Sequence, residues 1–416
     1  MTTSLSRNRE YRLLWVSQAL SEFGVNASFI AFPLLVLAVT GSAAASGVVL
    51  GTIAAAQLVA GLPAGAVADR WNRKTVMLVC EAVQAVAAAS LVGALWWGVA
   101  GVAHMVAVAA VMGVCTALFQ PAEEASLPNV VPTEQLATAV SMNAARGYLG
   151  QLSGTAAGGF LFAVGRAVPF VVDVLTHAAA FVALLFLRLP HREVVRRPVT
   201  RLGPEMAAGL RWVWGQRHVR ITAACAIMLN LFFSAFYIVV IVLAQARGVP
   251  AGEIGVMAAM LGVGGIVGAV IAPRLRRLMS PYLSIVSVFW VLTVLTPVAV
   301  VVDGGYLMGL LFAAMAVLPP TANTTIITAQ LLLTPDEMRG RLSAVMGVIT
   351  GVAAAAGPAL GGVLVEVVAG DHAVLLCAGG MAVASVLVTA SPALRRFPRY
   401  ETEDPTGVPM RGVHDG

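Results

Sequence analysis

A few ionisable side chains lie inside long apolar stretches of the sequence, where they could carry chemistry. Glu22 stands within the first stretch and Arg146 within a later one. A charged side chain at the centre of a membrane helix costs about 2.5–3.5 kcal/mol on insertion scales, so such residues usually have a function. Two interpretations remain open for this pair. Either Glu22 binds and releases a proton, or Glu22 and Arg146 form a permanent ion pair that orients their helices.

Three further ionisable residues in apolar stretches favour a structural explanation. Asp173 and His177 are one helical turn apart, and a hydrogen-bonded pair is favoured over a proton relay. Glu81 is expected near the cytoplasmic end of a membrane helix, packed against basic loop residues. No His, Cys or carboxylate residues cluster at ligand spacing, and the four cysteines stand singly in apolar stretches. We therefore expect no metal site and no cofactor. No nucleophile–base arrangement indicates an enzyme.

The composition identifies the solvent that surrounds these side chains. Of the 416 residues, 59% are hydrophobic and 11% are charged, and the mean hydropathy is +0.88. Soluble domains carry about 25% charged residues, so a chain this apolar must be dissolved in a lipid bilayer. The net charge of +6 does not indicate a nucleic-acid partner, because the basic residues lie in short clusters between apolar stretches.

Twelve apolar stretches are long enough to hold these side chains within a membrane. A helix of about 20 apolar residues crosses a bilayer. The expected helices begin near Leu13, Ala43, Thr75, Val102, Leu136, Val168, Ile221, Glu253, Tyr282, Tyr306, Leu342 and Ala373. The sequence therefore predicts an all-α integral membrane protein with twelve transmembrane helices.

The positions of the basic residues predict the orientation of these helices. With a cytoplasmic N-terminus, the outer loops hold only Arg166 and Arg247. The cytoplasmic segments then hold Arg7, Arg9, Arg12, Arg70, Arg73, Lys74, Arg274, Arg276, Arg277, Arg339, Arg341 and the arginines of the central loop and tail. Because cytoplasmic loops carry an excess of Lys and Arg, both termini are expected in the cytoplasm.

The two halves of the chain resemble each other, which predicts two six-helix pseudo-repeats. The shift of 203 positions that moves Gly154 onto Gly357 aligns two separate segments without a gap. It places Gly61, Gly65, Arg73, Pro132, Glu134, Gly158 and Gly159 on Gly264, Gly268, Arg276, Pro335, Glu337, Gly361 and Gly362. Repeats of this size are typical of transporters with a binding site between the halves. We expect bundles over 1–190 and 219–392, a cytoplasmic central loop over 191–218 and a cytoplasmic tail over 393–416.

The segment between the second and third helices resembles the signature of the major facilitator superfamily. The matching residues are Gly61, Gly65, Asp69, Arg70, Arg73 and Lys74, while Asn72 stands where the family usually has glycine. The resemblance covers nearly the whole chain. It implies a conformational latch: the glycines allow close helix packing, Asp69 meets the start of the eleventh helix, and the basic residues pair with Glu134 or Glu123. The latch would form when the cytoplasmic side is closed.

A second resemblance is to the glycine-rich signature of drug/proton antiporters. In the fifth helix Gly150, Gly154, Gly158 and Gly159 match it, although Thr155 replaces a proline. In the eleventh helix Gly357, Pro358, Gly361 and Gly362 give the full pattern. These residues imply close helix packing. The arginine-bearing signature of the fourth helix is absent, since residues 102–119 contain no arginine.

The resemblance also implies a central cavity lined by the first, fourth, seventh and tenth helices. In this arrangement Glu22 faces the cavity and is the candidate proton-coupling residue. The polar and aromatic residues expected beside it are Asn26, Phe29, Phe32, Asn230, Phe233, Tyr237 and Asn323. An apolar cavity with a few polar anchors suits amphipathic small molecules.

These observations predict a secondary active exporter of amphipathic drugs or natural products, coupled to proton antiport. Short stretches such as 127–132 and 334–341 resemble macrolide-efflux and enterobactin-export relatives, which implies export of bulky amphipathic natural products, either toxic drugs or siderophores. We also expect a monomer in a bacterial plasma membrane. One alternative is a dedicated siderophore or biosynthetic-product exporter. An alternative of another class is a transport-inactive membrane sensor or partner protein.

Overall fold

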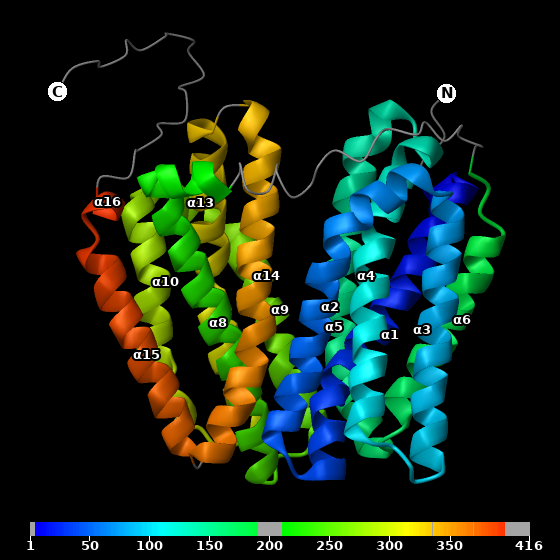
Figure 1. Ribbon diagram of the computed structural model, residues 1–416, viewed down its shortest axis with the longest axis horizontal. Coiled ribbons are helices and arrows are strands. Elements are labelled where there is room, and N and C mark those ends of the chain that lie inside the picture. The colour runs from blue at the N-terminus through cyan, green and yellow to red at the C-terminus, as the bar shows by residue number, and fades with distance from the viewer. Residues whose placement is uncertain (1–4, 190–209, 335, 369, 396–416) are drawn as a thin grey trace.

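A computed structural model describes residues 5–189, 210–334, 336–368 and 370–395, and this part of the chain is helical with no strand (Figure 1). The first half contains α1 Arg9–Thr40, α2 Ala43–Arg70, α3 Arg73–Trp96, α4 Val102–Val130, α5 Leu136–Val164 and α6 Val168–Leu185. The second half contains α8 Arg217–Ala246, α9 Ala251–Leu278, α10 Pro281–Leu295, α11 Val298–Val301, α12 Gly305–Ala316, α13 Pro319–Leu333, α14 Asp336–Val367, α15 Asp371–Ala390 and α16 Pro392–Arg395. Two 3₁₀ turns, Leu5–Arg7 and Thr133–Gln135, precede α1 and α5.

Eleven helical segments of the described part are long and apolar enough to cross a membrane, and α5 runs beside them as the twelfth. Two of the crossings are broken near prolines. The ninth consists of α10 and α11, which separate before Pro297, and the tenth consists of α12 and α13, which separate before Pro319. Proline removes a backbone donor and disrupts the helix. The prediction of a twelve-helix membrane fold is confirmed.

Short polar residues begin several of these helices and so define the turns. The side chains of Asn8, Ser42, Asn72 and Ser280 each accept a hydrogen bond from the backbone N–H three residues later. This is the usual N-cap arrangement, which satisfies a donor that the helix itself leaves unpaired. Gly41, at φ 69°, supplies the left-handed conformation that ends α1 before α2 turns back.

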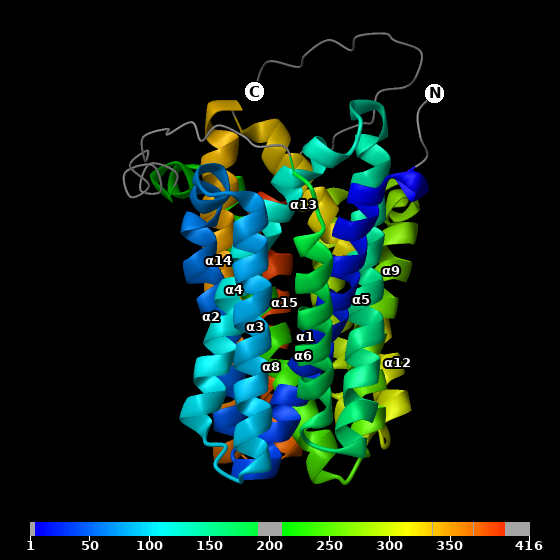
Figure 2. The same ribbon diagram turned by 90° about the vertical axis from the view of Figure 1, so that its right-hand side faces the viewer.

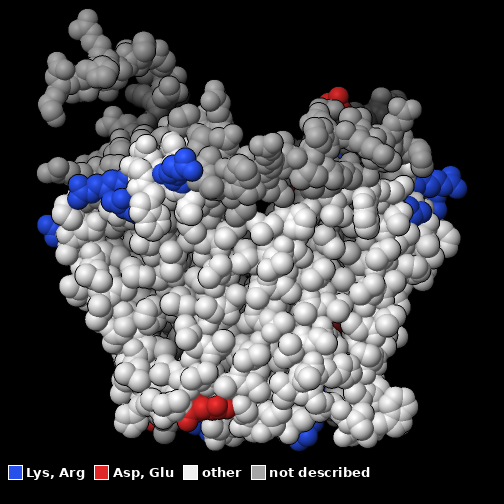
Figure 3. All heavy atoms as spheres, viewed as in Figure 1, with Lys and Arg blue, Asp and Glu red and all other residues white. Residues whose placement is uncertain are grey.

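The helices form two bundles that lie side by side, α1–α6 and α8–α15 (Figure 1). The start of α1 and the segment α16 lie at one end (Figure 1), where most of the Lys and Arg side chains on the face shown in Figure 3 also gather. We call this end, with the turn after α2 and the turn after α9, the basic end. The opposite end, with the turns at 41–42, 165–167, 247–250 and 302–304, is the far end. The predicted central loop lies mainly outside the described residues.

Two helix pairs join the bundles, α2 with α14 and α5 with α9, and the second pair is seen side by side in Figure 2. Both contacts are close because glycines remove side chains from the seam. A Cβ atom built on Gly47 would lie 2.1 Å from the carbonyl oxygen of Pro358, and one on Gly159 would lie 2.3 Å from that of Ala251. Only small residues allow backbones to approach in this way.

The seam between α2 and α14 is tight toward the far end and open toward the basic end. Leu58 packs on Gly351 as the last close glycine contact in that direction among the described residues. Beyond it, a Cβ built on Gly61 of α2 or Gly347 of α14 would meet nothing within 4 Å. The ribbons of the two bundles likewise converge at the far end and diverge toward the basic end (Figure 1). In this structure the two halves are therefore in close contact along α2 and α14 at the far end and apart at the basic end.

Candidate functional site

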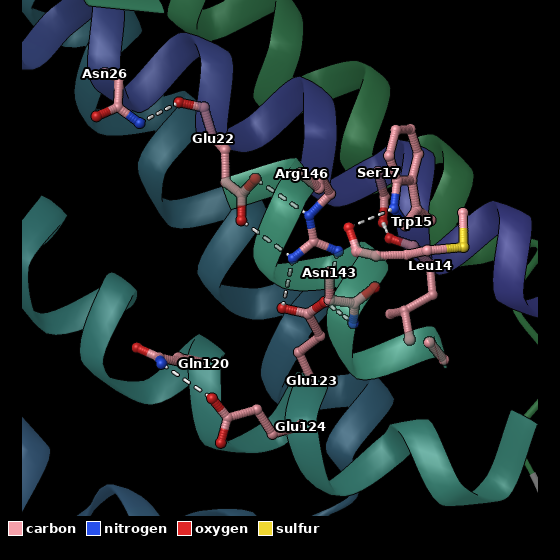
Figure 4. A network of polar contacts seen from close by, with 12 residues as sticks. Leu14, Trp15, Ser17, Glu22, Asn26, Gln120, Glu123, Glu124, Asn143 and Arg146 are labelled. Carbon is pink, nitrogen blue, oxygen red and sulfur yellow. Dashed lines mark hydrogen bonds and ion pairs between the residues drawn. The ribbon is translucent and has the colours of Figure 1, made fainter. Parts of the chain in front are cut away.

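The site is built around the point where α5 crosses α1. A Cβ atom built on Gly150 of α5 would lie 2.8 Å from the Cβ of Glu22 on α1, so the missing side chain brings the two helices together. One turn earlier on α5, Arg146 reaches the Glu22 carboxylate with two nitrogens, Nε to Oε2 and Nη2 to Oε1, both at 3.1 Å. Asn26 donates from Nδ2 to the Glu22 carbonyl oxygen at 2.7 Å. Figure 4 shows this arrangement.

A second carboxylate completes the site from the other side of the arginine. Glu123 of α4 accepts from Arg146 Nη1 at 2.8 Å and from Nη2 at 3.2 Å (Figure 4). Asn143, one turn before Arg146, donates to Glu123 Oε1 at 3.4 Å, and Tyr11 donates to Asn143 Oδ1 at 3.3 Å. The guanidinium is thus shared between carboxylates of α1 and α4.

The triad of Glu22, Glu123 and Arg146 contains two acidic side chains and one basic side chain. With both carboxylates ionised its net charge is −1. The exposed fraction of the side chain is 5% for Arg146, 8% for Glu123 and 25% for Glu22. Removing an uncompensated charge from water is costly, and Glu22 is the member that water reaches most readily. The arrangement therefore has one carboxylate in excess of its single guanidinium, and Glu22 is the carboxylate that solvent reaches.

Sequence reasoning missed Glu123 as the partner of Arg146. We expected it in the loop after the fourth helix, as a partner for the basic residues of the latch, and this expectation is wrong. The helix α4 continues through Pro121 and Pro128 to Val130, so Glu123 lies inside the bundle rather than in a loop. A signal was present in the sequence, since an acidic pair beside Pro121 is unusual in an otherwise apolar helix.

A second buried cluster lies between α1, α3 and α6. His177 Nδ1 is 2.6 Å from Glu81 Oε2, and His177 Nε2 is 3.3 Å from Asp173 Oδ1. Ser21, the neighbour of Glu22 in sequence, lies 3.3 Å from the same histidine nitrogen and donates to Glu81 at 3.4 Å. The histidine and both acids are buried. The expectation that Glu81 packs against basic loop residues is therefore wrong, because its side chain turns into the bundle toward α6.

The predicted latch is only partly described. The side chains of Gly65, Asp69 and Arg70 lie outside the described residues. Arg73 donates to the carbonyl oxygen of Ala125 on α4, and Lys74 donates to that of Leu185 on α6 at 2.7 Å. The structure does not bring Arg73 or Lys74 to Glu123.

Gly61 is exposed and makes no close contact. A Cβ atom built on it would meet nothing within 4 Å, so the close packing expected at this glycine is absent here. This agrees with a seam that is open at the basic end. Glu134, the other carboxylate expected to serve the latch, is exposed.

The glycines of the antiporter-like signature divide their contacts between the bundles. Gly150, Gly154 and Gly158 of α5 pack against α1, and Gly357 and Gly361 of α14 pack against α8, so these five join helices within a bundle. The other three face the opposite bundle: Gly159 packs against α9, Gly362 against Ala43, and Pro358 against Gly47.

The residues expected around a cavity do not share one environment. Phe32 is fully buried and meets Phe170 edge to face, with ring centroids 5.1 Å apart, so the structure places it in the bundle core instead of on a cavity wall. Tyr237 stacks on Phe312 at 6.2 Å inside the second bundle. Asn230 donates to the carbonyl oxygen of Ala226 on its own helix at 2.9 Å. Phe29 and Phe233 are half-buried, and Asn323 is exposed.

Comparison with known proteins identifies relatives along nearly the full length of the chain. Residues 2–409 match a family model described as transmembrane secretion effector. The multidrug efflux pump Tap of Mycobacterium tuberculosis is 28% identical over 429 residues, which cover 95% of this chain and 97% of that protein. The pump of the same name from Mycolicibacterium fortuitum is 28% identical over 403 residues, covering 90% and 93%.

Solved structures show the same fold at low sequence identity. The nucleoside transporter NupG superposes with a TM-score of 0.76 at 12% identity, covering 94% of this chain and all of that one. A bacterial homolog of the human lysosomal transporter Spinster, in an inward-facing and occupied conformation, gives a TM-score of 0.68 at 14% identity and covers 96% of this chain. At these identities the likeness concerns the fold alone.

Proposed function

The chain belongs to the transmembrane secretion effector family of the major facilitator superfamily, and from this premise we propose that it exports amphipathic small molecules by proton antiport. The relatives that it resembles over nearly their full length are named multidrug efflux pumps. The single observation that carries the proton-coupling part is the triad of Glu22, Glu123 and Arg146, which holds one acid more than base within the membrane part of the fold.

The orientation follows from the distribution of charge. We place the basic end in the cytoplasm, because Lys and Arg accumulate on the cytoplasmic side of membrane proteins. The protein is then a component of the bacterial plasma membrane with both termini inside, and the described conformation is open to the cytoplasm. One chain contains both six-helix bundles, so a monomer suffices for transport.

The triad supports a mechanism in which a proton and a substrate compete for one negative charge. When Glu22 is protonated, Arg146 and Glu123 form a neutral pair. When Glu22 loses its proton to the cytoplasm, the site carries a net charge of −1 and attracts the cationic part of a substrate. An ion that binds only one state of a transporter shifts its conformational equilibrium. Exclusive occupancy by proton or substrate gives antiport.

The competing explanation is that Glu22 and Arg146 form a permanent ion pair that only orients helices. The bidentate contact is compatible with this role, since an arginine fork binds a carboxylate with two parallel hydrogen bonds. The presence of Glu123 argues against it, because Arg146 would remain paired if Glu22 were neutral. A permanent pair requires one acid, and the site contains two.

Transport into inverted membrane vesicles tests this proposal. Vesicles with the wild-type protein and an imposed proton gradient should accumulate a cationic dye such as ethidium, and Glu22→Gln should abolish the gradient-driven part. Glu124→Gln is the matched control, because this exposed carboxylate is one residue from Glu123 and bonds only to Gln120 in the described contacts.

The outcomes separate the candidate functions. Unchanged accumulation in Glu22→Gln contradicts the coupling role and leaves Glu22 as a structural residue. Absence of any dye accumulation by the wild type contradicts multidrug export. The next substrates to test are then siderophores and biosynthetic products, and failure with those favours a sensor or partner protein.

A further inference from the structure

The first turn of α2 at the far end lacks an acidic residue of its own. Ser42 is its N-cap, and the Ser42 hydroxyl accepts a hydrogen bond from the N–H of Ala45 at 3.0 Å. The N-terminus of a helix has unpaired N–H groups and a partial positive charge, which a carboxylate in the first turn usually stabilises. In α2 the first turn is Ala43, Ala44 and Ala45, so the carboxylate must come from elsewhere.

It comes from the other bundle. Glu366, in the last turn of α14, accepts a hydrogen bond from the N–H of Ala44 at 3.1 Å and a short one from the Ser42 hydroxyl. Ser42 and Glu366 together satisfy two N–H groups in the first turn of α2, those of Ala45 and Ala44. The two residues belong to different elements, the start of α2 and the last turn of α14, and these helices join the two halves of the transporter.

This cap can exist only while the far end is closed. Ser42 and Glu366 lie at the far end of the glycine seam, next to the contact of Ala43 with Gly362 and one turn from the contact of Gly47 with Pro358. Separation of α2 from α14 at this end breaks these contacts and the cap together. An α2 N-terminus without its acid is less stable than a capped one.

The second seam, between α5 and α9, has no corresponding polar contact in the described part of the chain. There Phe160 packs on Gly252, and Gly159 packs on Gly255. The first turn of α9 does contain an acid, Glu253, but this carboxylate accepts from the N–H of Gly305 at 3.0 Å within its own bundle. Among the described residues, the hydrogen bonds that join the two bundles at the far end therefore lie between α2 and α14.

We propose that Glu366 is a gate residue of the transporter, which holds the far end closed by capping α2 from the opposite bundle. The proposal rests on the alternating-access exporter described above and assigns a positioning role to a residue outside the central site. The cap stabilises only the state that is closed at the far end. Loss of an exposed N-cap of this kind shifts a two-state equilibrium by roughly fivefold, so Glu366 sets how often the far end opens.

Distance measurements between the bundles test this gate. Spin labels at Trp97→Cys and Tyr306→Cys, both exposed at the far end, report opening in purified protein reconstituted into lipid nanodiscs. The four native cysteines are buried, which limits unwanted labelling. The variants are Glu366→Ala, which removes the acceptor, and Ser42→Ala, which removes its partner. Asp303→Asn is the matched control, since it removes a carboxylate at the same end without touching the seam.

We expect Glu366→Ala and Ser42→Ala each to raise the ratio of the long-distance to the short-distance population about fivefold, with Asp303→Asn close to wild type. Distance distributions of Glu366→Ala that match the wild type overturn the proposal. An equal shift in Asp303→Asn also overturns it, because the effect would then reflect surface charge alone.

This readout requires neither dye nor proton gradient. It therefore stays informative if Glu22 fails as the coupling residue. Conversely, a wild-type protein that shows one distance in every condition, with ethidium as well as without, contradicts alternating access itself.

Discussion

Glu22 of α1 and Asn230 of α8 stand at equivalent positions in the two bundles, but only one of them can be charged. The equivalence follows from helix contacts that recur in both halves. A Cβ atom built on Gly158 would lie 2.4 Å from the carbonyl oxygen of Ala27, and one built on Gly361 would lie 2.4 Å from that of Ala235. Counting back five residues from each alanine gives Glu22 and Asn230.

The other members of the triad also have uncharged counterparts. The shift that aligns the fifth and eleventh helices places Arg146 on Ile349, and the same shift places Glu123 on Ile326. Among described residues, the charged or ionisable polar side chains that are buried all belong to the first bundle: Glu81, Glu123, Arg146, Asp173 and His177. The second bundle buries the hydroxyl residues Thr222, Ser284, Thr296, Thr321, Thr334 and Ser385.

The comparison distinguishes residues that pack helices in both bundles from residues that place charge in one bundle. Close helix packing is the same in both bundles and depends on small residues, so it belongs to the scaffold. Buried charge occurs in one bundle, where it costs stability, so it indicates the half that handles ions. We infer that protons are bound in the first bundle, and that the second bundle moves against it without titrating in its core.

The largest expected effect comes from removing the base of the triad. Arg146→Met leaves Glu22 and Glu123 facing each other without a counter-charge, and breaking a buried pair in this way costs about 3–5 kcal/mol. The apparent thermal unfolding midpoint in detergent should fall sharply. Ile349→Met, the equivalent change in the second bundle, should cost less than about 1.5 kcal/mol.

A compensating variant sharpens this prediction. Adding Glu123→Gln to Arg146→Met should recover much of the lost stability, because only one carboxylate then remains and it can hold a proton. Equal unfolding midpoints for Arg146→Met and the wild type would mean that the triad contributes no net stabilisation. The expected difference between Arg146→Met and Ile349→Met would then be absent.

The next effect tests the part that the bundles share. Gly154→Ala and Gly357→Ala place a Cβ atom 2.5 Å from the carbonyl oxygen of Phe23 and 2.8 Å from that of Leu231. Overpacking of this kind costs about 1–3 kcal/mol, and we expect similar losses from the two variants in thermal unfolding. Gly265→Ala is the control, since its new methyl group meets nothing within 4 Å. A large loss in only one bundle would contradict the shared scaffold.

A smaller effect concerns the second charged cluster of the first bundle. Ser21→Ala removes the hydroxyl that bonds to Glu81 and lies beside His177, which should cost about 1–2 kcal/mol. Ser153→Ala removes an exposed hydroxyl that bonds only to its own helix, and it should be nearly neutral. Indistinguishable unfolding curves for the two variants would show that the cluster does not depend on α1.

The smallest effect is expected at the uncharged counterpart of Glu22. Asn230 bonds to a carbonyl oxygen of its own helix, and such contacts stabilise little. Asn230→Ala should change stability by less than about 1 kcal/mol and should leave gradient-driven dye transport in vesicles intact. Loss of coupling in this variant would place part of the ion chemistry in the second bundle.

Much of the fold could be predicted because its signals are local. Apolar stretches of sufficient length predicted the twelve crossings. The pairing of Glu22 with Arg146 was one of two interpretations that depth in the membrane left open. The pairing could be proposed from sequence because a buried acid and a buried base are each costly alone and less costly together.

The rest of the site depends on features that no local pattern encodes. Glu123 could not be placed because helix α4 continues through two prolines, and this depends on packing against neighbouring helices. The direction in which Glu81 points follows from the crossing of α3 and α6. Phe32 was expected on a cavity wall since its spacing fits one face of α1, but the position of Phe170 makes that face the core.

The measurement that tests the central claim most directly is proton release on substrate binding. Ethidium is added to the purified protein in weakly buffered detergent solution with a pH indicator. We predict that the wild type releases protons as the dye binds, that Asn230→Ala releases the same number, and that Glu22→Gln binds dye without release. Release by Glu22→Gln equal to that of the wild type would contradict proton–substrate competition at the triad.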